Sequence, residues 1–317
     1  MEKEQSIYEL IKSNLKDDNS LSHDFCHINH EGIGILDGSQ DGKILYYDGN
    51  GYKEMPKEMI TVFKDITLGN INKAIEKAEN LISKEESILY ILDMIEEYIV
   101  ENKDYIYPER LYEFCKEIIK KSRNKQLIKM CLSLLELICL EDNEEILNII
   151  CTMGTCDEFT LYSIYALRML ERGNDHIFEL AKNTKGWGRI HAVEYVEPLL
   201  NEIKKWLLIE GYKNNVLLSH SALTCAQKSD LLERLKKNNF TNEEFECASE
   251  IIAILLQDEA IRGIKEFVND EELLQAYLSC CDEREYSDGI EQTKDDIERY
   301  FRKQKTYVNP NKIKKMN

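Results

Sequence analysis

Proline and glycine are scarce in this sequence, with four and 14 residues respectively among 317. Both residues interrupt helices, and both are common in the turns of all-β domains. Charged residues make up 32% of the chain and hydrophobic residues 43%. This combination argues against a β-sandwich, a collagen-like chain or a disordered chain, and it predicts a mainly helical protein with a substantial core.

Basic residues are also fewer than acidic ones. The chain has 41 Lys and Arg residues against 59 Asp and Glu residues, so its formal net charge is −18. Nucleic-acid-binding proteins neutralise phosphates with clustered basic side chains, and a negative field repels DNA, RNA and anionic lipid. The exception is a basic tail at residues 304–317, which we interpret as a solvated end. We therefore expect no nucleic-acid or membrane partner, and we expect a basic protein or peptide instead.

Several further signals are missing. No apolar run approaches the length of a membrane span, and the acidic start MEKEQ lacks the apolar region of a signal peptide. The ten cysteines include no CxxC pair, which is typical of a reduced, cytoplasmic protein. The sequence has no Walker A, GxGxxG, HExxH or GxSxG motif. It therefore gives no positive sign of an enzyme and predicts no cofactor.

Helical periodicity dominates the chain after residue 56. A first short helix is predicted at residues 5–15 from the spacing of its apolar side chains. The later helices are predicted at 57–67, 70–82, 85–101, 107–122, 124–140, 142–151, 157–171, 175–183, 187–196, 199–210, 214–227, 229–237, 242–256, 258–268, 270–280 and 285–303. The sequence Thr241-Asn-Glu-Glu244 has the form of a capping box at the start of one of them.

The N-terminal region has a different pattern. The runs GIGIL (32–36), KILYY (43–47) and YKEM (52–55) are separated by DGSQDG and DGNG, which are typical turn sequences. These runs predict a small β-meander. We therefore divide the chain into residues 1–56, with a helix and the β-meander, an α-helical repeat domain at 57–303, and the basic tail.

The helical region contains a repeat. Each of the segments SIYALRML, RIHAVEYV, SHSALTCA and ECASEIIA has an alanine ahead of an apolar residue, and the alanines lie 26, 30 and 26 residues apart. These anchors are Ala166, Ala192, Ala222 and Ala248. Repeated helix pairs bury their apolar faces by stacking. Residues 157–256 resemble short HEAT-like repeats, which implies an α-solenoid or superhelix that binds other proteins.

The stretch DGSQDGKILYYD at residues 37–48 matches the ligand spacing of an EF-hand calcium loop. The calcium ligands would be Asp37, Ser39, Asp41 and Asp48. An EF-hand has a helix on each side of the loop, whereas this stretch lies between the predicted strands. Two tight turns around a strand therefore explain the Asp and Gly residues better than a calcium site does.

A second possible metal site is the sequence SHDFCHINH. Its four soft or borderline ligands could bind zinc or nickel; they are His23, Cys26, His27 and His30. No second ligand pair has a matching spacing. We favour a polar loop ahead of the predicted β-meander and assign no metal.

The segment TKGWGRIHAVEYV places functional side chains on one helix. At 100° per residue, Arg189 falls within the apolar arc and is predicted to be partly buried and paired with a carboxylate or with carbonyls. The opposite side is a candidate ligand- or partner-binding face, which His220 could join; its residues are Trp187, His191, Glu194 and Tyr195. The alternative is that Trp187 simply packs on the next repeat.

The longer segment TKGWGRIHAVEYVEPLLNEIKKWLLIEGYKNNV resembles an uncharacterised family from Gram-positive bacteria that is sometimes labelled limonene hydroxylase. The label implies an oxygenase, but the sequence has no haem-thiolate cysteine motif and no flavin fingerprint. The chain also resembles HEAT-like DNA glycosylases, whose basic concave face its acidity does not match. We therefore predict a non-enzymatic protein- or peptide-binding scaffold; the alternative is an enzyme acting on a small molecule or nucleobase around Trp187.

Overall fold

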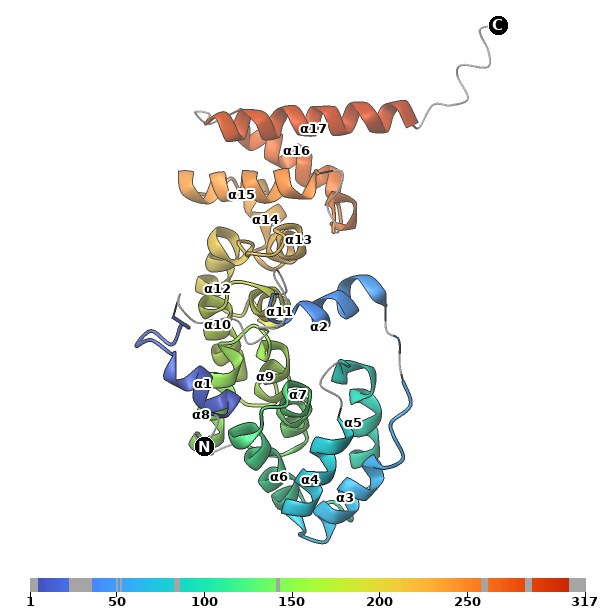
Figure 1. The fold of residues 1–317 in the computed structure, drawn as a ribbon. Coiled ribbons are helices and arrows are strands. Elements are labelled where there is room, and N and C mark those ends of the chain that lie inside the picture. Colours follow the sequence, from blue (N-terminus) through green and yellow to red (C-terminus); the bar gives the residue numbers. More distant parts are fainter. Residues whose placement is uncertain are drawn as a thin grey trace, which may run out of the picture. The chain divides into compact units, whose positions relative to one another are not determined.

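The computed structural model describes residues 5–22, 36–49, 51, 53–82, 86–140, 143–257, 262–282 and 287–307. Every regular element within these ranges is a helix, and their one β pairing is an isolated antiparallel bridge between Leu15 and Leu21. The mainly helical class predicted from composition is confirmed (Figure 1). None of the described helices combines the length and the apolar character that a membrane span needs.

The chain packs into two compact units, Met1–Val196 and Glu197–Asn317. The helices of the first unit are α1 (Ile7–Ser13), α2 (Ser39–Lys43), η1 (Ile44–Asp48), α3 (Met59–Thr67), α4 (Ile71–Leu81), η2 (Ile88–Tyr90), α5 (Leu92–Glu101), α6 (Pro108–Lys121), α7 (Lys125–Leu134), η3 (Leu135–Leu137), α8 (Glu144–Gly154), α9 (Thr160–Leu167), α10 (Gly173–Asn183) and α11 (Trp187–Tyr195). Those of the second unit are α12 (Asn201–Trp206), η4 (Leu207–Gly211), α13 (Ser219–Lys228), α14 (Leu231–Lys236), α15 (Asn242–Leu255), η5 (Ile264–Glu266), α16 (Asp270–Cys281) and α17 (Asp288–Tyr307).

Local sequence explains many of the helix boundaries. Asn124 and Asn143 accept hydrogen bonds from the first turns of α7 and α8 through their side chains. Thr241 forms the predicted capping box with Glu244 at the start of α15. These side chains satisfy amide groups that a helix start leaves without partners. The predicted helix at 258–268 is an exception, because its described part contains only the single turn η5.

The core of the first unit is centred on α7, whose residues from Gln126 to Leu134 are all buried. It packs against α6 and α9, and α9 packs against α11. In the second unit α13 packs against α15, α14 against α16, and α15 against α17. All four alanine anchors of the repeat are fully buried, as expected where helices approach closely.

The predicted β-meander is wrong where the structure describes it. The run KILYY belongs to the end of α2 and to the π-helix η1, and residues 53–55 have no regular structure. The run GIGIL, apart from Leu36, lies outside the described residues. Residues 36–48, called the strap below, pack onto the rest of the first unit, and Figure 1 shows α2 beside α11 before the chain crosses to α3. This packing outweighs the local β-propensity of the isoleucine and tyrosine residues.

Candidate functional site

The strap is attached by a buried ion-pair cluster. The Nζ atom of Lys129, on α7, lies 2.7 Å from Asp41 Oδ2 and 2.7 Å from Glu158 Oε1, and the Lys129 side chain is fully buried. The backbone N–H of Gly38 donates to Glu158 Oε2 at 2.8 Å. Burial opposes the charge on Lys129, but the two carboxylates outweigh it and raise the pKa of the ammonium group. Buried charges are tolerated only when they are paired in this way.

Two glycines let the strap approach α11 closely. A Cβ atom on Gly42 would lie 2.3 Å from Cε3 of Trp187, and one on Gly38 would lie 2.7 Å from the carbonyl oxygen of Asp157. Gly38 also has a φ of +76°, which favours glycine. Above the indole, the ring of Tyr46 lies 5.8 Å from Trp187 and 6.2 Å from His191. The strap therefore covers the side of α11 that carries Trp187 and His191.

The packing of the strap on α11 contradicts part of the prediction for the binding face. Trp187 and His191 are 5% and 2% exposed, so the interpretation that they project from a non-core face is wrong. Trp187 is buried, as the alternative expected, but it packs against Gly42 and Tyr46 of the strap, whereas that alternative expected packing on the next repeat. Sequence periodicity placed both residues on one side of the helix but gave no sign that the strap packs there.

The other predicted residues are dispersed. Glu194 is exposed and Tyr195 is half-buried. His220 is buried within the second unit, where burial and the charge of Arg262 lower its pKa. Arg189 is partly buried, as predicted, and donates to the carbonyl oxygens of Thr184 at 2.7 Å and Lys182 at 3.0 Å.

The calcium-like stretch does not form an EF-hand loop. Ser39 begins α2 and Asp48 ends η1. The oxygens of Asp41 accept from Ser87 Oγ and Lys129 Nζ, each at 2.7 Å, and Asp37 accepts from the Cys156 thiol at 3.8 Å. No cluster of three or more metal-ligating His, Cys, Asp or Glu side chains occurs among the described residues. The other candidate cluster, His23, Cys26, His27 and His30, lies outside them.

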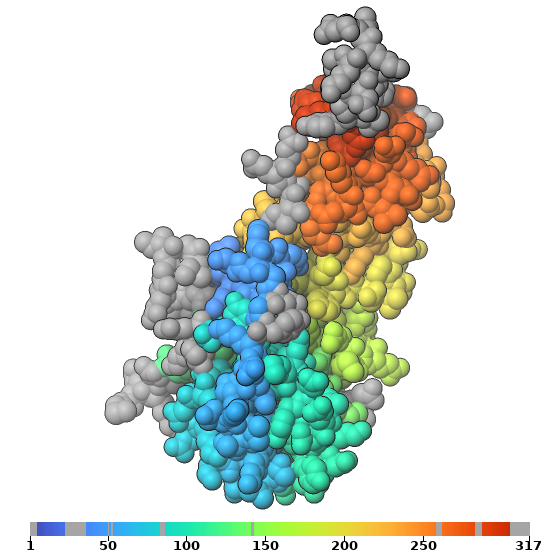
Figure 2. All heavy atoms as spheres, turned by 90° about the vertical axis from the view of Figure 1, so that its right-hand side faces the viewer, coloured from blue at the N-terminus to red at the C-terminus, as the bar shows by residue number. Residues whose placement is uncertain are grey.

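Ile44 and Leu45 of the strap form one wall of a cavity of about 190 Å³, called the strap pocket below. The opposite walls come from η2, α5 and α9. In Figure 2 the strap is part of the blue segment on the visible face of the first unit. The lining residues combine apolar, aromatic and acidic side chains: Ile44, Leu45, Gly51, Leu89, Tyr90, Asp93 and Tyr165.

Behind the pocket-lining Asp93 lies Glu96, whose carboxyl group has an unusual environment. Glu96 lies one helical turn after Asp93 on α5 and is half-buried. Burial, together with repulsion from Glu136 and Asp93, raises the pKa of Glu96 to about 8. Arg168 pairs with Glu136 at 2.9 Å and offsets part of this repulsion. A carboxyl group that stays protonated at neutral pH beside a cavity is typical of a functional site.

The tyrosines of the strap pocket already face cations. Lys53 Nζ lies 4.9 Å from the ring centroid of Tyr90, and the guanidinium of Arg168 lies 5.2 Å from that of Tyr165. Tyr195, one of the predicted site residues, packs edge-on against Tyr165 with ring centroids 5.9 Å apart. No spacing in the sequence linked α5, α9 and the strap, so this pocket was not predicted.

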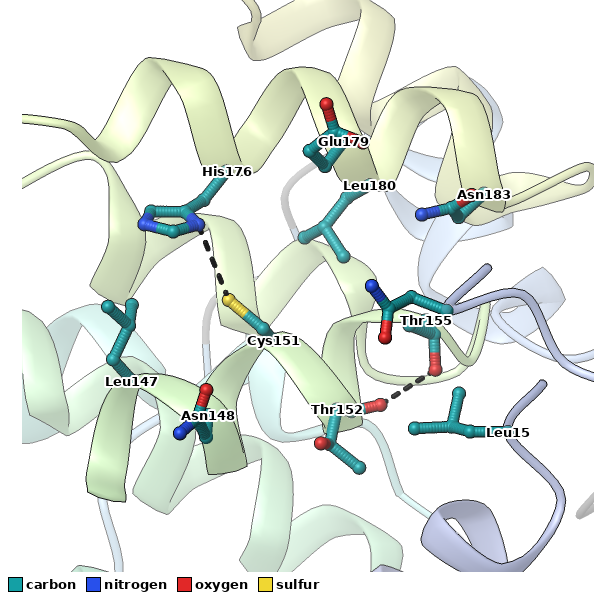
Figure 3. Close-up of a pocket in the computed structure, with 11 residues that line it drawn as sticks. Leu15, Leu147, Asn148, Cys151, Thr152, Thr155, His176, Glu179, Leu180 and Asn183 are labelled. Atoms are coloured by element: carbon teal, nitrogen blue, oxygen red, sulfur yellow. Dashed lines mark hydrogen bonds between the residues drawn. The ribbon is translucent and has the colours of Figure 1, made fainter. Parts of the chain in front are cut away.

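A second cavity, of about 240 Å³, lies between α8 and α10. Figure 3 shows Cys151 and His176 pointing toward one another from these helices, with 3.8 Å between Sγ and Nδ1. Burial raises the pKa of Cys151 to about 11. The group is therefore a neutral thiol near pH 7, which favours a hydrogen bond to the imidazole over the thiolate of a reactive cysteine.

Comparisons with known proteins found no counterpart: no family model, no curated protein sequence and no solved structure matches this chain. The resemblances to HEAT-like repeats, to HEAT-like glycosylases and to the family labelled limonene hydroxylase therefore stay predictions.

Proposed function

We propose that the chain is a HEAT-like α-solenoid that works in the cytoplasm as a scaffold for a basic peptide or protein. In this proposal the strap pocket takes one lysine or arginine side chain of the partner. The observation that supports it most directly is the meeting of Asp93, two tyrosine rings and the apolar strap residues around one cavity.

The buried alanines support the repeat architecture. In the first unit Ala166 and Ala192 lie on the packed pair α9 and α11, and in the second Ala222 and Ala248 lie on the packed pair α13 and α15. The same small residue thus recurs at comparable helix contacts in both units. Stacked helix pairs of this kind provide extended binding surfaces. The free cysteines among the described residues agree with a reducing cytoplasm.

The composition of the strap pocket favours a long cationic side chain. Ile44, Leu45 and Leu89 can cover the methylene groups of a lysine or arginine, while the Asp93 carboxylate attracts its charged end. The net charge of −18 attracts basic partners over longer distances.

The alternative, an enzyme with a site around Trp187, has less support. The indole lies beneath Gly42 and Tyr46 of the strap, so a substrate could reach it only if the strap moved away. The strap is held by the buried Asp41–Lys129–Glu158 cluster, and opening it would separate Asp41 from the buried ammonium group of Lys129 and leave that group with Glu158 alone.

The proposal can be tested with a peptide array read out by the full-length protein. Each lysine peptide is paired with the same peptide carrying acetyl-lysine, which keeps the stem and removes the charge. We expect binding to lysine peptides and its loss on acetylation. Asp93→Asn should weaken binding ~10-fold or more, the usual effect of removing a charged partner. Glu101→Gln, which removes an exposed acid at the end of the same helix, is the matched control.

Two results would contradict the proposal. One is equal binding of lysine and acetyl-lysine peptides. The other is an equal loss in the Asp93→Asn and Glu101→Gln variants, which would mean that net charge attracts the peptides and that the pocket does not.

A further inference from the structure

The second unit contains a polar cavity of about 320 Å³ between α12, α14 and the start of α15. Three basic side chains line it, Lys204 and Lys205 from α12 and Arg234 from α14. Two acids line it as well, Asp230 and Glu244. The lining therefore has one more positive than negative group, in a chain whose net charge is −18.

Both carboxylate oxygens of Glu244 already have partners within the protein. Its Oε2 accepts from the backbone N–H of Thr241 at 2.8 Å, which completes the capping box of α15. Its Oε1 pairs with Arg234 at 3.0 Å. Lys205 reaches this same oxygen only at 3.9 Å, and its side chain is 57% exposed. Glu244 thus caps the start of α15 and pairs with the guanidinium of Arg234, so it neutralises Lys205 only weakly.

Arg234 and Lys204 are the other two cationic residues that line the cavity. Arg234 Nε is buried and has no hydrogen-bond partner within the part of the chain that the structure describes. Lys204 pairs with Asp230 at 2.6 Å, but both side chains are substantially exposed, at 30% and 51%. Water screens an exposed pair of this kind, so it contributes little and a ligand can compete for the lysine. The amides of Asn201 and Asn239 line the same cavity.

We propose that this cavity binds a phosphate monoester group of a small molecule, with Lys204, Lys205 and Arg234 as its cationic contacts. A phosphate dianion accepts several charge-assisted hydrogen bonds at once, and this cavity offers ammonium, guanidinium and amide donors around one space. A divalent anion also suits two lysines that are poorly neutralised by their protein partners. The site is separate from the strap pocket, so either proposal can fail without the other.

The test is calorimetric titration of the full-length protein with phenyl phosphate and with inorganic phosphate, at constant ionic strength in chloride. We expect saturable binding of both probes. The double variant Lys204→Gln/Lys205→Gln should weaken it ~10-fold or more, since each lysine supplies a charge-assisted hydrogen bond. Lys213→Gln removes an exposed lysine elsewhere in the second unit, where it pairs with Glu210, and it should bind as wild type does.

Binding of wild-type strength in the double variant would overturn the proposal, as would an equal loss in Lys213→Gln. Absence of saturation by either probe would overturn it too. If inorganic phosphate binds but phenyl phosphate does not, the cavity is an adventitious ion site only and the monoester proposal fails. Thermal melts of all variants check that each is folded.

Discussion

Gly42 lies directly against the indole of Trp187, so closely that a Cβ atom there would sit 2.3 Å from the ring carbon Cε3. This contact joins the strap to a helix more than 140 residues away in the sequence. It also explains why Trp187 is buried on a side of α11 that periodicity assigns to the outside. Any side chain at position 42 must displace either the strap or the indole.

We therefore expect Gly42→Ala to destabilise the first unit. Overpacking of a well-packed contact typically costs ~1–3 kcal/mol. Urea denaturation followed by tryptophan fluorescence measures the loss, in a Trp206→Phe background where Trp187 is the one remaining tryptophan. Gly51→Ala is the control, because a Cβ at Gly51 meets only ordinary van der Waals contact with Tyr90. Equal midpoints for Gly42→Ala and wild type would show that the strap does not rest on the indole.

Because Lys129 is the cation of the buried ion-pair cluster, we expect its substitution to destabilise the first unit more than Gly42→Ala does. Lys129→Met leaves Asp41 buried without its cation and leaves Glu158 only Lys125, at 4.0 Å. Removing one partner of a buried ion pair typically costs ~3–5 kcal/mol. Neutralising the acids in Lys129→Met/Asp41→Asn/Glu158→Gln should recover part of the loss. Denaturation midpoints of the two variants test this. If the triple variant is less stable than Lys129→Met alone, charge burial is not the cause.

The sequence was informative about helices because local signals determine them. The predicted helix at 107–122 and the observed Pro108–Lys121 differ by one residue at each end, and Thr241 caps α15 as predicted. Arg189 also has the burial and the carbonyl partners that its place in the apolar arc predicts.

The strap shows where such reasoning fails. The alternation in ILYY is typical of a strand, yet these residues are helical because Ile44 and Tyr46 pack inward against distant helices. The glycines of DGSQDG suggested turns, and Gly38 does lie in one, whereas Gly42 is helical. Both glycines also provide room, for Trp187 and for the backbone of Asp157. The strap pocket depends on the same long-range contacts, and no local pattern in the sequence encodes them.

Cys151 should be much less reactive than an exposed cysteine. Burial raises its pKa to about 11, so at pH 8 only ~0.1% of the thiol is ionised, and alkylation requires the thiolate. Iodoacetamide labelling followed by mass spectrometry should modify the exposed Cys139 first. The rate at Cys151 should rise about tenfold for each pH unit up to about 11. Rapid labelling of Cys151 at pH 7 would instead mean that His176 activates it as a nucleophile.

The raised pKa of Glu96 predicts how the stability of the folded chain depends on pH. The folded chain keeps a proton on this carboxyl group up to about pH 8, whereas the unfolded chain loses it near the ordinary value of 4.5. The folded state therefore binds more protons between these two values, and the contribution of Glu96 to stability falls as pH rises through this window.

Glu96→Gln removes the titration, so we expect it to match wild type near pH 5 and to be more stable at pH 9. Because the side chain is only half-buried, we expect a gain of roughly 1–2 kcal/mol, well below the full value of the pKa shift. Thermal melts across this range test the prediction, with the exposed neighbour Glu97→Gln as control. If the difference between Glu96→Gln and wild type does not change with pH, Glu96 is ionised in the folded protein. The strap pocket would then have a second full negative charge at neutral pH.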